Sequence, residues 1–263
     1  MTDVVTETLD AGVCTISLNR PDRRNAMNTE LLNALVAAAA RAVADPRVGA
    51  IVLRGEGGTF CVGGDVKGMA EGSGADLTYE RRAEGLRGRM EVVRLIHDSN
   101  RPSVAAISGA AAGAGLSLAL ACDFRIAGRS AKLTTAFAKV GLSGDFGGTW
   151  FLTQLVGTAK ARELYLTSPV LTAQQALDLG LVTQVVDDDA VDATALALAR
   201  QLADGPRITL GYIKQNLNDA QTGSLAHSLD REAERHTRCA FTEDHREAAS
   251  AFVEKRKPVF TGR

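Results

Sequence analysis

The chain has 263 residues with 30 basic and 31 acidic side chains, which suits one large domain or a core with an appendage and leaves no basic block for nucleic-acid phosphates. Its four cysteines form no CxxC pair and its four histidines no HExxH motif, which argues against zinc and against a disulfide framework. An acidic N-terminal segment unlike a signal peptide, and a longest apolar run of only residues 116–121, indicate a protein of the reducing cytoplasm with no membrane partner.

The N-terminal part alternates predicted strands with predicted helices. "VCTISLN" places Cys14, Ile16 and Leu18 on one face and predicts a strand, after which "RPDRRNAMN" is a loop. Apolar residues at three- and four-residue steps predict a helix from position 28 or 29 to 45. The continuous apolar strand "VGAIVLRG" then enters the turn "GEGGTFCVGGDVKGM", and residues 70–85 are expected to form a mobile loop or a frayed helix.

The rest of the chain continues this alternation and then becomes helical. "RGRMEVVRLIHDSN" predicts a helix, "RPSVAAISG" a strand, "AAAGAGLSLALA" a turn and helix, and "CDFRIAG" a strand. Helices are expected in "TWFLTQLVGTAKARELYLT" and in "TAQQALDLG", where Thr172 and Gln175 form a capping box and Gly180 ends the helix. "LVTQVV" is the last strand, followed by helices over 190–204, 207–220 and 225–256. The pattern predicts an α/β core with parallel strands, crossover helices and a helical tail.

Two glycine-rich turns follow predicted strands. "AAISGAAAGAGLSLA" has the strand–GxxxGxG–helix form of a dinucleotide site, but it does not follow the first strand and no acidic residue stands about twenty positions later. With "FCVGGDVKGM" it can instead direct two backbone N–H groups into one cleft, which is the geometry of an oxyanion hole. A third segment, "KVGLSGDFGGTW", places Asp145 among four glycines.

These three segments, in this order, resemble the crotonase superfamily of enoyl-CoA hydratases and isomerases. The likeness begins at "ISLNRPDRRNAMN" and continues through "LTAQQALDLGLVTQVV" to "FVEKRKPVF", so it covers almost the whole chain. It implies a crotonase-type spiral of ββα units over residues 1–190, a C-terminal helical trimerisation or lid region over 191–263, and a homotrimer or dimer of trimers. It also implies an acyl-CoA thioester substrate and no separate cofactor, because coenzyme A enters as part of the thioester.

The resemblance also assigns residues to the site. By motif position, the two N–H donors are those of Val62 and Ala114. Arg24 lies in the loop that borders the CoA entrance in the family, and Lys257 lies at a helical end that can meet the CoA phosphates of a neighbouring subunit. The residues expected to surround the substrate are Arg24, Val62, Gly63, Gly64, Asp65, Ala114, Ser117, Phe137, Trp150 and Lys257, with no metal.

The chain departs from the hydratases of this family at two positions. Those enzymes resemble two-glutamate catalysts, whereas the corresponding residues here are Ser117 and Phe137. Asp145 is the carboxylate that remains, in a GLxxDxGG setting similar to that of single-aspartate enoyl-CoA isomerases. Nearby Phe137, Phe146 and Trp150 are expected to raise its pKa by desolvation.

The sequence therefore predicts an isomerase that moves a double bond from the 3,4 to the 2,3 position of an enoyl-CoA, with Asp145 carrying the proton. Three alternatives stay open. They are an enoyl-CoA hydratase, a hydrolase or dehalogenase that uses Asp145 as a nucleophile on an acyl-CoA, and a family member that binds acyl-CoA without converting it.

Overall fold

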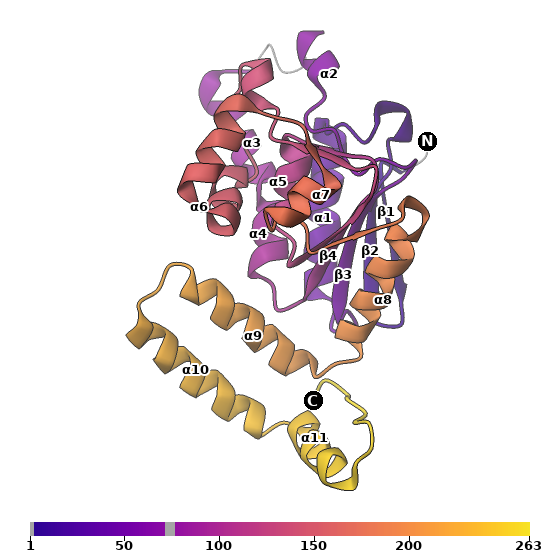
Figure 1. Ribbon diagram of the computed structural model, residues 1–263, viewed down its shortest axis with the longest axis vertical. Helices are drawn as coiled ribbons and strands as arrows, with labels where there is room; N and C mark the ends of the chain where they lie inside the picture. The colour runs from indigo at the N-terminus through magenta and orange to yellow at the C-terminus, as the bar shows by residue number, and fades with distance from the viewer. Residues whose placement is uncertain (1–2, 72–76) are drawn as a thin grey trace.

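The computed structural model describes residues 3–71 and 77–263, which form a six-stranded sheet, a three-stranded sheet, covering helices and a helical extension (Figure 1). The strands are β1 Val5–Asp10, β2 Val13–Leu18, β3 Ala50–Gly55, β4 Ser103–Ile107, β5 Ala110–Ala112, β6 Phe124–Gly128, β7 Lys132–Thr134, β8 Leu171–Thr172 and β9 Gln184–Val186. The α-helices are α1 Thr29–Ala44, α2 Val66–Ala70, α3 Tyr79–Arg89, α4 Glu91–Asp98, α5 Ala114–Leu120, α6 Gly148–Thr167, α7 Ala173–Asp178, α8 Val191–Ala203, α9 Arg207–Ala220, α10 Leu225–Ala240 and α11 Glu243–Glu254.

The larger sheet confirms the predicted α/β class with crossover helices. Its order is β1-β2-β3-β4-β6-β9; β1 pairs antiparallel with β2, and every later neighbour pairs in parallel. The smaller sheet, in the order β5-β7-β8, was not predicted, because its strands are only two or three residues long. Strand β1 was also missed, since its sequence "VTETLD" is polar and it lies at the exposed edge of the sheet.

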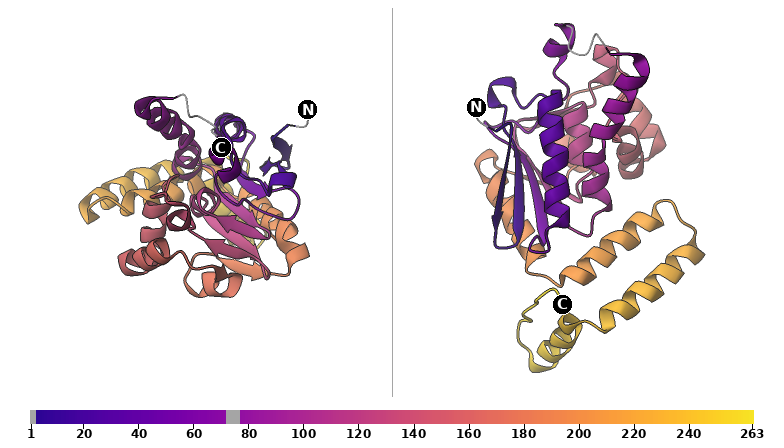
Figure 2. Two further views of the ribbon diagram at one scale, coloured as in Figure 1. Left: turned by 90° about the horizontal axis from the view of Figure 1, so that it is seen from above. Right: turned by 180° about the vertical axis from the view of Figure 1, so that it is seen from behind.

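The central strands β3 and β4 of the large sheet are buried on both faces, as the continuous apolar sequence of β3 predicts. Figure 2 shows α1 over one face and α8 over the other. Each face of the sheet packs against its own hydrophobic core, and alternate residues of β3 point into the two cores. Ile51 and Leu53 face the α1 side, and Ala50 and Val52 face the α8 side. Cys14, Ile16 and Leu18 share the α1 side, as predicted.

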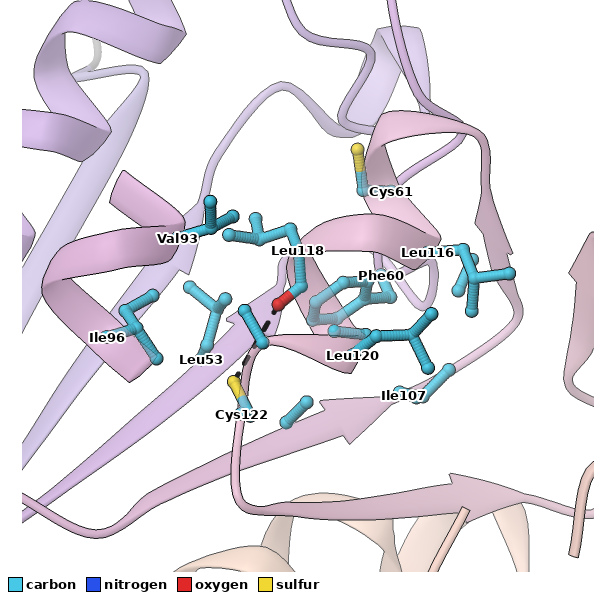
Figure 3. Packing of buried hydrophobic residues seen from close by; sticks show 14 of the residues in the cluster. Leu53, Phe60, Cys61, Val93, Ile96, Ile107, Leu116, Leu118, Leu120 and Cys122 are labelled. Atoms are coloured by element: carbon cyan, nitrogen blue, oxygen red, sulfur yellow. Dashed lines mark hydrogen bonds between the residues drawn. The ribbon is translucent and has the colours of Figure 1, made fainter. Parts of the chain in front are cut away.

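The core on the α1 side supports the site directly. Phe60, fully buried, lies beside Leu118 and Leu120 of α5 in a cluster that also contains Ile96 of α4 (Figure 3). The turn after β3 and helix α5 therefore rest on one apolar base. Because buried side chains pack at crystal-like density, this base fixes the relative position of the two glycine-rich turns.

Two helix boundaries differ from the predictions. Residues 79–89, inside the segment expected to be a mobile loop or frayed helix, form α3, whose N-cap is Thr78; positions 72–76 of that segment lie outside the described residues. The helix predicted over 225–256 is two helices, because Thr242 caps α11 by accepting a hydrogen bond from the backbone N–H of His245 at 3.0 Å. The capping box of Thr172 and Gln175 is present as predicted.

Helix α8 packs against β3, β4 and β6, whereas α9 and α10 form a hairpin that extends from the core (Figure 1). Lys214 anchors α9. Its buried ammonium group donates hydrogen bonds to the carbonyls of Ile96 and Arg101, at 2.8 and 2.9 Å, and to the Asp123 carboxylate at 2.8 Å. All three donors of the ammonium are thus satisfied, as a buried charge requires. No helix of the described residues is both long and apolar enough to cross a membrane.

Candidate active site

The two glycine-rich turns lie side by side. Cys61, in the turn after β3, donates its N–H to the carbonyl of Ala110 at 2.9 Å and accepts from the N–H of Ala112 at 3.0 Å. Gly63 has a φ of +91° and sits so close to the other turn that a Cβ there would lie 2.8 Å from the carbonyl oxygen of Ala112. Glycine is therefore required at this position for both conformation and space.

Val62 and Ala114, the two predicted donors, flank this contact. A Cβ on Gly63 would lie 3.4 Å from the backbone nitrogen of Ala114, so the turn that carries Val62 passes directly beside the Ala114 N–H. Ala114 is the first residue of α5, where the N–H has no acceptor within the helix and the helix dipole is positive. The N–H of Val62 makes a long hydrogen bond, 3.3 Å, to the carbonyl of Arg24.

The turn that carries Asp145 depends on its glycines. Gly144 and Gly147 have φ values of +115° and +68°. Phe146 between them also has a positive φ, +49°, although its side chain is buried at 2% exposure. A left-handed conformation is costly for a bulky residue and persists only where the surroundings impose it, which is typical of functional sites. The turn is thus held in an unusual shape around the carboxylate.

The Asp145 side chain is partly buried, and one oxygen of its carboxylate is enclosed without a partner in the described part of the chain. Its Oδ1 atom is inaccessible and has no hydrogen-bond partner among the described residues. Burial raises the pKa of Asp145 from 3.8 to about 6, in agreement with the expected desolvation. A carboxylate with this pKa exists in both protonation states near neutral pH, which suits a group that accepts a proton and returns it.

The two positions that correspond to the hydratase glutamates carry no charge and are both buried. Ser117 is on α5, and its hydroxyl donates to the carbonyl of Gly113 at 3.3 Å. Phe137 stacks parallel on Tyr165 with a centroid distance of 5.9 Å. Of the three motif positions, Asp145 is therefore the one that carries a carboxylate.

Arg24 and Gly64 lie in a hollow beside the Val62 donor. The cavity has a volume of about 380 Å³ and is lined by both residues together with Arg23, Val62 and Lys67. Its three cations outnumber its two carboxylates, Asp22 and Asp65, which leaves the hollow with the net positive charge that suits a phosphate-bearing ligand.

Asp65 also lines this hollow, but its carboxylate is engaged within the protein. It forms an ion pair with Arg20 at 3.2 Å and caps α2 by accepting from the N–H of Gly68 at 3.1 Å. These contacts hold the pKa of Asp65 below its usual range.

Trp150 and Lys257 lie outside this arrangement. Trp150 packs edge-on against His97 and Phe151 and lines a second cavity of about 420 Å³, which Gly147 of the Asp145 turn also borders. His97 is a helix residue of α4, as the sequence suggests, and it is half-buried at this cavity. Lys257 follows α11, which lies at the opposite end of the molecule from α2 (Figure 1). A single chain therefore does not bring Lys257 to the Arg24 hollow.

Sequence analysis missed Tyr165 of α6. Its hydroxyl lies directly beneath the Asp145 turn, because a Cβ added to Gly148 would be 2.4 Å from it and one added to Gly144 would be 3.5 Å from it. A single tyrosine within a helix gives no signal in the sequence. Only the folding of α6 against the turn reveals its place.

The fold is that of the crotonase superfamily of enzymes. The chain belongs to the enoyl-CoA hydratase/isomerase family, whose model matches residues 8–263. It is 39% identical to the 1,2-epoxyphenylacetyl-CoA isomerase of Escherichia coli K12, over the full length of both chains. It is 36% identical to the 2,3-dehydroadipyl-CoA hydratase of the same organism, covering 95% of this chain and 96% of that one.

Solved structures agree. An enoyl-CoA hydratase from Polaromonas sp. JS666 superposes with a TM-score of 0.92 at 33% identity, covering 98% of this chain and 99% of that chain. The relatives therefore carry both hydratase and isomerase names, and the choice between these activities depends on the residues of this site.

Proposed function

We propose that this protein is an enoyl-CoA isomerase that moves a double bond from the 3,4 to the 2,3 position of an acyl-CoA thioester. The proposal rests on Asp145, whose Oδ1 atom is buried and has no hydrogen-bond partner among the described residues, while the two positions of the hydratase glutamates hold the uncharged Ser117 and Phe137. Isomerisation needs one base, because the same group can remove and return the proton. Hydration needs a nucleophilic water to be activated while the α-carbon gains a proton.

The proposed reaction uses three groups of the chain. The thioester oxygen accepts hydrogen bonds from the N–H groups of Val62 and Ala114, the first of which exchanges its long bond to Arg24 for the ligand. The Asp145 carboxylate removes a proton from C2, and the electron pair delocalises into a dienolate whose charge rests on the thioester oxygen. The carboxylic acid then gives the proton to C4, which forms the 2,3 double bond and regenerates the carboxylate.

The hydratase alternative draws support from the names of relatives such as the 2,3-dehydroadipyl-CoA hydratase. It would require Asp145 alone to activate water and supply the second proton. Offering 3-enoyl-CoA and 2-enoyl-CoA separately discriminates the two. Conversion of the 3-enoyl substrate to the conjugated thioester, with the 2-enoyl substrate left unhydrated, supports the isomerase. Rapid loss of the conjugated absorbance from 2-enoyl-CoA would establish the hydratase, and binding of both without turnover would establish a binding role.

We expect Arg24→Ala to raise KM for acyl-CoA substrates about tenfold with little change in kcat, because Arg24 lines the cationic hollow beside the thioester site. Steady-state kinetics with the N-acetylcysteamine thioester provide the control, since that substrate lacks the CoA phosphates. KM for it should be the same in both proteins. An equal loss with both substrates would show that Arg24 acts on the turn itself rather than on CoA.

The proposal includes self-assembly through residues 191–263. Large apolar side chains of α9 to α11 are exposed in the single chain, among them Leu217, Leu225, Phe241 and Phe252. Exposed apolar surface of this extent marks an interaction site. In a trimer or dimer of trimers, Lys257 would reach the CoA phosphates bound by a neighbour. Light scattering of the purified protein tests this, and a monomer would contradict it.

A further inference from the structure

The last residues of the chain fold back along α11 (Figure 1). Lys255 ends the helix with a φ of +55°, and the N–H of Arg256 donates to a carbonyl in the last turn of α11 at 3.0 Å. At the other end of α11, the N–H of Asp244 donates to the carbonyl of Arg263 at 3.0 Å. Residues 256–263, which we name the C-terminal strap, therefore run from the end of α11 back to its beginning.

Asp244, which is 3% exposed, holds the far end of the C-terminal strap. Its Oδ1 atom accepts a hydrogen bond from the N–H of Thr261 at 2.7 Å, and the N–H of Gly262 lies 3.2 Å from Oδ1 and 3.0 Å from Oδ2. A buried carboxylate is costly unless donors surround it, and here the strap supplies these donors. The contact therefore stabilises both the carboxylate and the folded-back course of the chain.

Glu247, one turn further along α11, holds the near end of the strap. Its carboxylate accepts hydrogen bonds from both terminal nitrogens of Arg256, at 2.5 and 2.9 Å, and from the N–H of Val259 at 2.8 Å. These hydrogen bonds, those of Arg256 foremost, lower the pKa of Glu247 to about 2, so the group is ionised at neutral pH. Lys257 lies between the two residues that Glu247 holds, so its backbone is fixed while its side chain is exposed.

We propose that Asp244 and Glu247 are positioning residues, which hold the strap so that the Lys257 ammonium group reaches the CoA phosphates in a neighbouring subunit. A lysine on a free chain end would have to be ordered when the ligand binds, whereas a fixed backbone reduces that entropic cost. The strap also presents apolar surface to a second copy of the chain, because Val259 is 72% exposed and Phe252 of α11 is 85% exposed. The inference rests on the proposed function, since it assumes the assembly and the CoA contact of Lys257.

The test uses Asp244→Asn and Glu247→Gln, which remove the charge of each carboxylate with little change of shape, and Lys257→Ala, which removes the proposed contact. Asp230→Asn is the matched control, because Asp230 is an exposed carboxylate of α10. Calorimetry measures Kd for butyryl-CoA, a probe with no double bond to move. Kinetics with the N-acetylcysteamine thioester of a 3-enoyl acid report the chemistry without the CoA phosphates. Hydrogen exchange of the strap amides reports whether the strap is released from α11.

We expect Lys257→Ala, Asp244→Asn and Glu247→Gln each to raise Kd for butyryl-CoA about fivefold, with kcat/KM for the N-acetylcysteamine thioester changed less than about twofold. Asp244→Asn and Glu247→Gln should also speed exchange of the strap amides about tenfold. The double variant Asp244→Asn/Lys257→Ala should bind no more weakly than Lys257→Ala alone, because both substitutions remove one contact. Asp230→Asn should match the wild type in every measurement.

Wild-type Kd in Asp244→Asn and Glu247→Gln, together with a raised Kd in Lys257→Ala, would overturn the inference and leave the Lys257 contact in place. Wild-type Kd in Lys257→Ala would overturn that contact, and this inference with it. A fall in kcat/KM for the N-acetylcysteamine thioester as large as the rise in Kd would show a general disturbance of the fold and would also overturn the inference. Failure of the isomerase proposal would appear separately, as absence of turnover in the wild type, because the measurement of Kd does not depend on the chemistry.

Discussion

Asp145→Asn is expected to lower kcat/KM for isomerisation of 3-enoyl-CoA about a thousandfold, because the amide cannot accept the C2 proton. The side chains have nearly the same shape, so the variant should fold and bind acyl-CoA as the wild type does. The measurement is the rate of appearance of the conjugated thioester. Asp178→Asn, at an exposed carboxylate of α7 that contacts Gln174, is the matched control and should keep full activity. Retention of more than about a tenth of the wild-type activity in Asp145→Asn would exclude this residue as the base.

The raised pKa of Asp145 predicts two effects of pH, one on the activity of the wild type and one on the stability of Asp145→Asn. Since the base must be ionised, wild-type kcat/KM should fall about tenfold per pH unit below the pKa of about 6.

The folded protein binds this proton more tightly than the unfolded chain, whose pKa is 3.8, so wild-type stability falls as pH rises from about 4 to 6. Asp145→Asn removes the penalty and should be the more stable protein at pH 7, with the difference fading below pH 4. Urea unfolding at pH 7 and below pH 4 measures the difference in stability between the two proteins. A variant less stable than the wild type at pH 7 would contradict the burial of the Asp145 carboxylate.

Gly148→Ala is expected to destabilise the fold by about 3 kcal/mol and to reduce kcat at least about a hundredfold. The added methyl group would lie 2.2 Å from the Ser117 hydroxyl and 2.4 Å from the Tyr165 hydroxyl, well inside contact distance for buried groups. One of the two side chains, or the Asp145 turn itself, has to move. The conformation of Gly148 is not the obstacle, because its φ lies outside the left-handed region and alanine is otherwise favoured in a helix.

Gly88→Ala provides the comparison, since Gly88 lies in α3 and nothing is within 4 Å of the Cβ it would gain. That substitution should be neutral or stabilise by up to about 1 kcal/mol. Urea denaturation and steady-state kinetics of both variants measure the contrast. Equal effects of the two substitutions would mean that the hydroxyl groups do not close over Gly148.

The glycines around Asp145 show how far sequence reasoning reaches. Their density predicted a turn that can adopt positive φ values, and Gly144 and Gly147 have positive φ values. Gly148 is required because a Cβ there would meet the side chains of Ser117 and Tyr165. The strand faces of Cys14, Ile16 and Leu18 and the capping box of Thr172 were equally accessible, because they depend on local spacing. Whole-chain resemblance to the crotonases was needed to relate turns that lie far apart in the sequence.

The features that sequence reasoning missed depend on contacts between distant segments. Tyr165 acquires its place only when α6 packs beneath the Asp145 turn, and the ring contacts of His97 with Trp150 and Phe151 join segments that are about fifty residues apart. The polar edge strand β1 has no apolar alternation to reveal it, and the break at Thr242 requires a cap that competes with helix continuation. Local pattern therefore predicted most of the elements and the resemblance proposed the donors, whereas the surroundings of these residues required the structure.

The central claim is that one carboxyl group carries the proton from C2 to C4. Isomerisation of 3-enoyl-CoA in D₂O, with the product analysed by NMR and mass spectrometry, tests it most directly. The account predicts a conjugated 2-enoyl-CoA in which the hydrogen gained at C4 is mainly protium, because the buried Asp145 carboxyl returns the proton that it removed. Mainly deuterium at C4, or a 3-hydroxyacyl-CoA product, would contradict it.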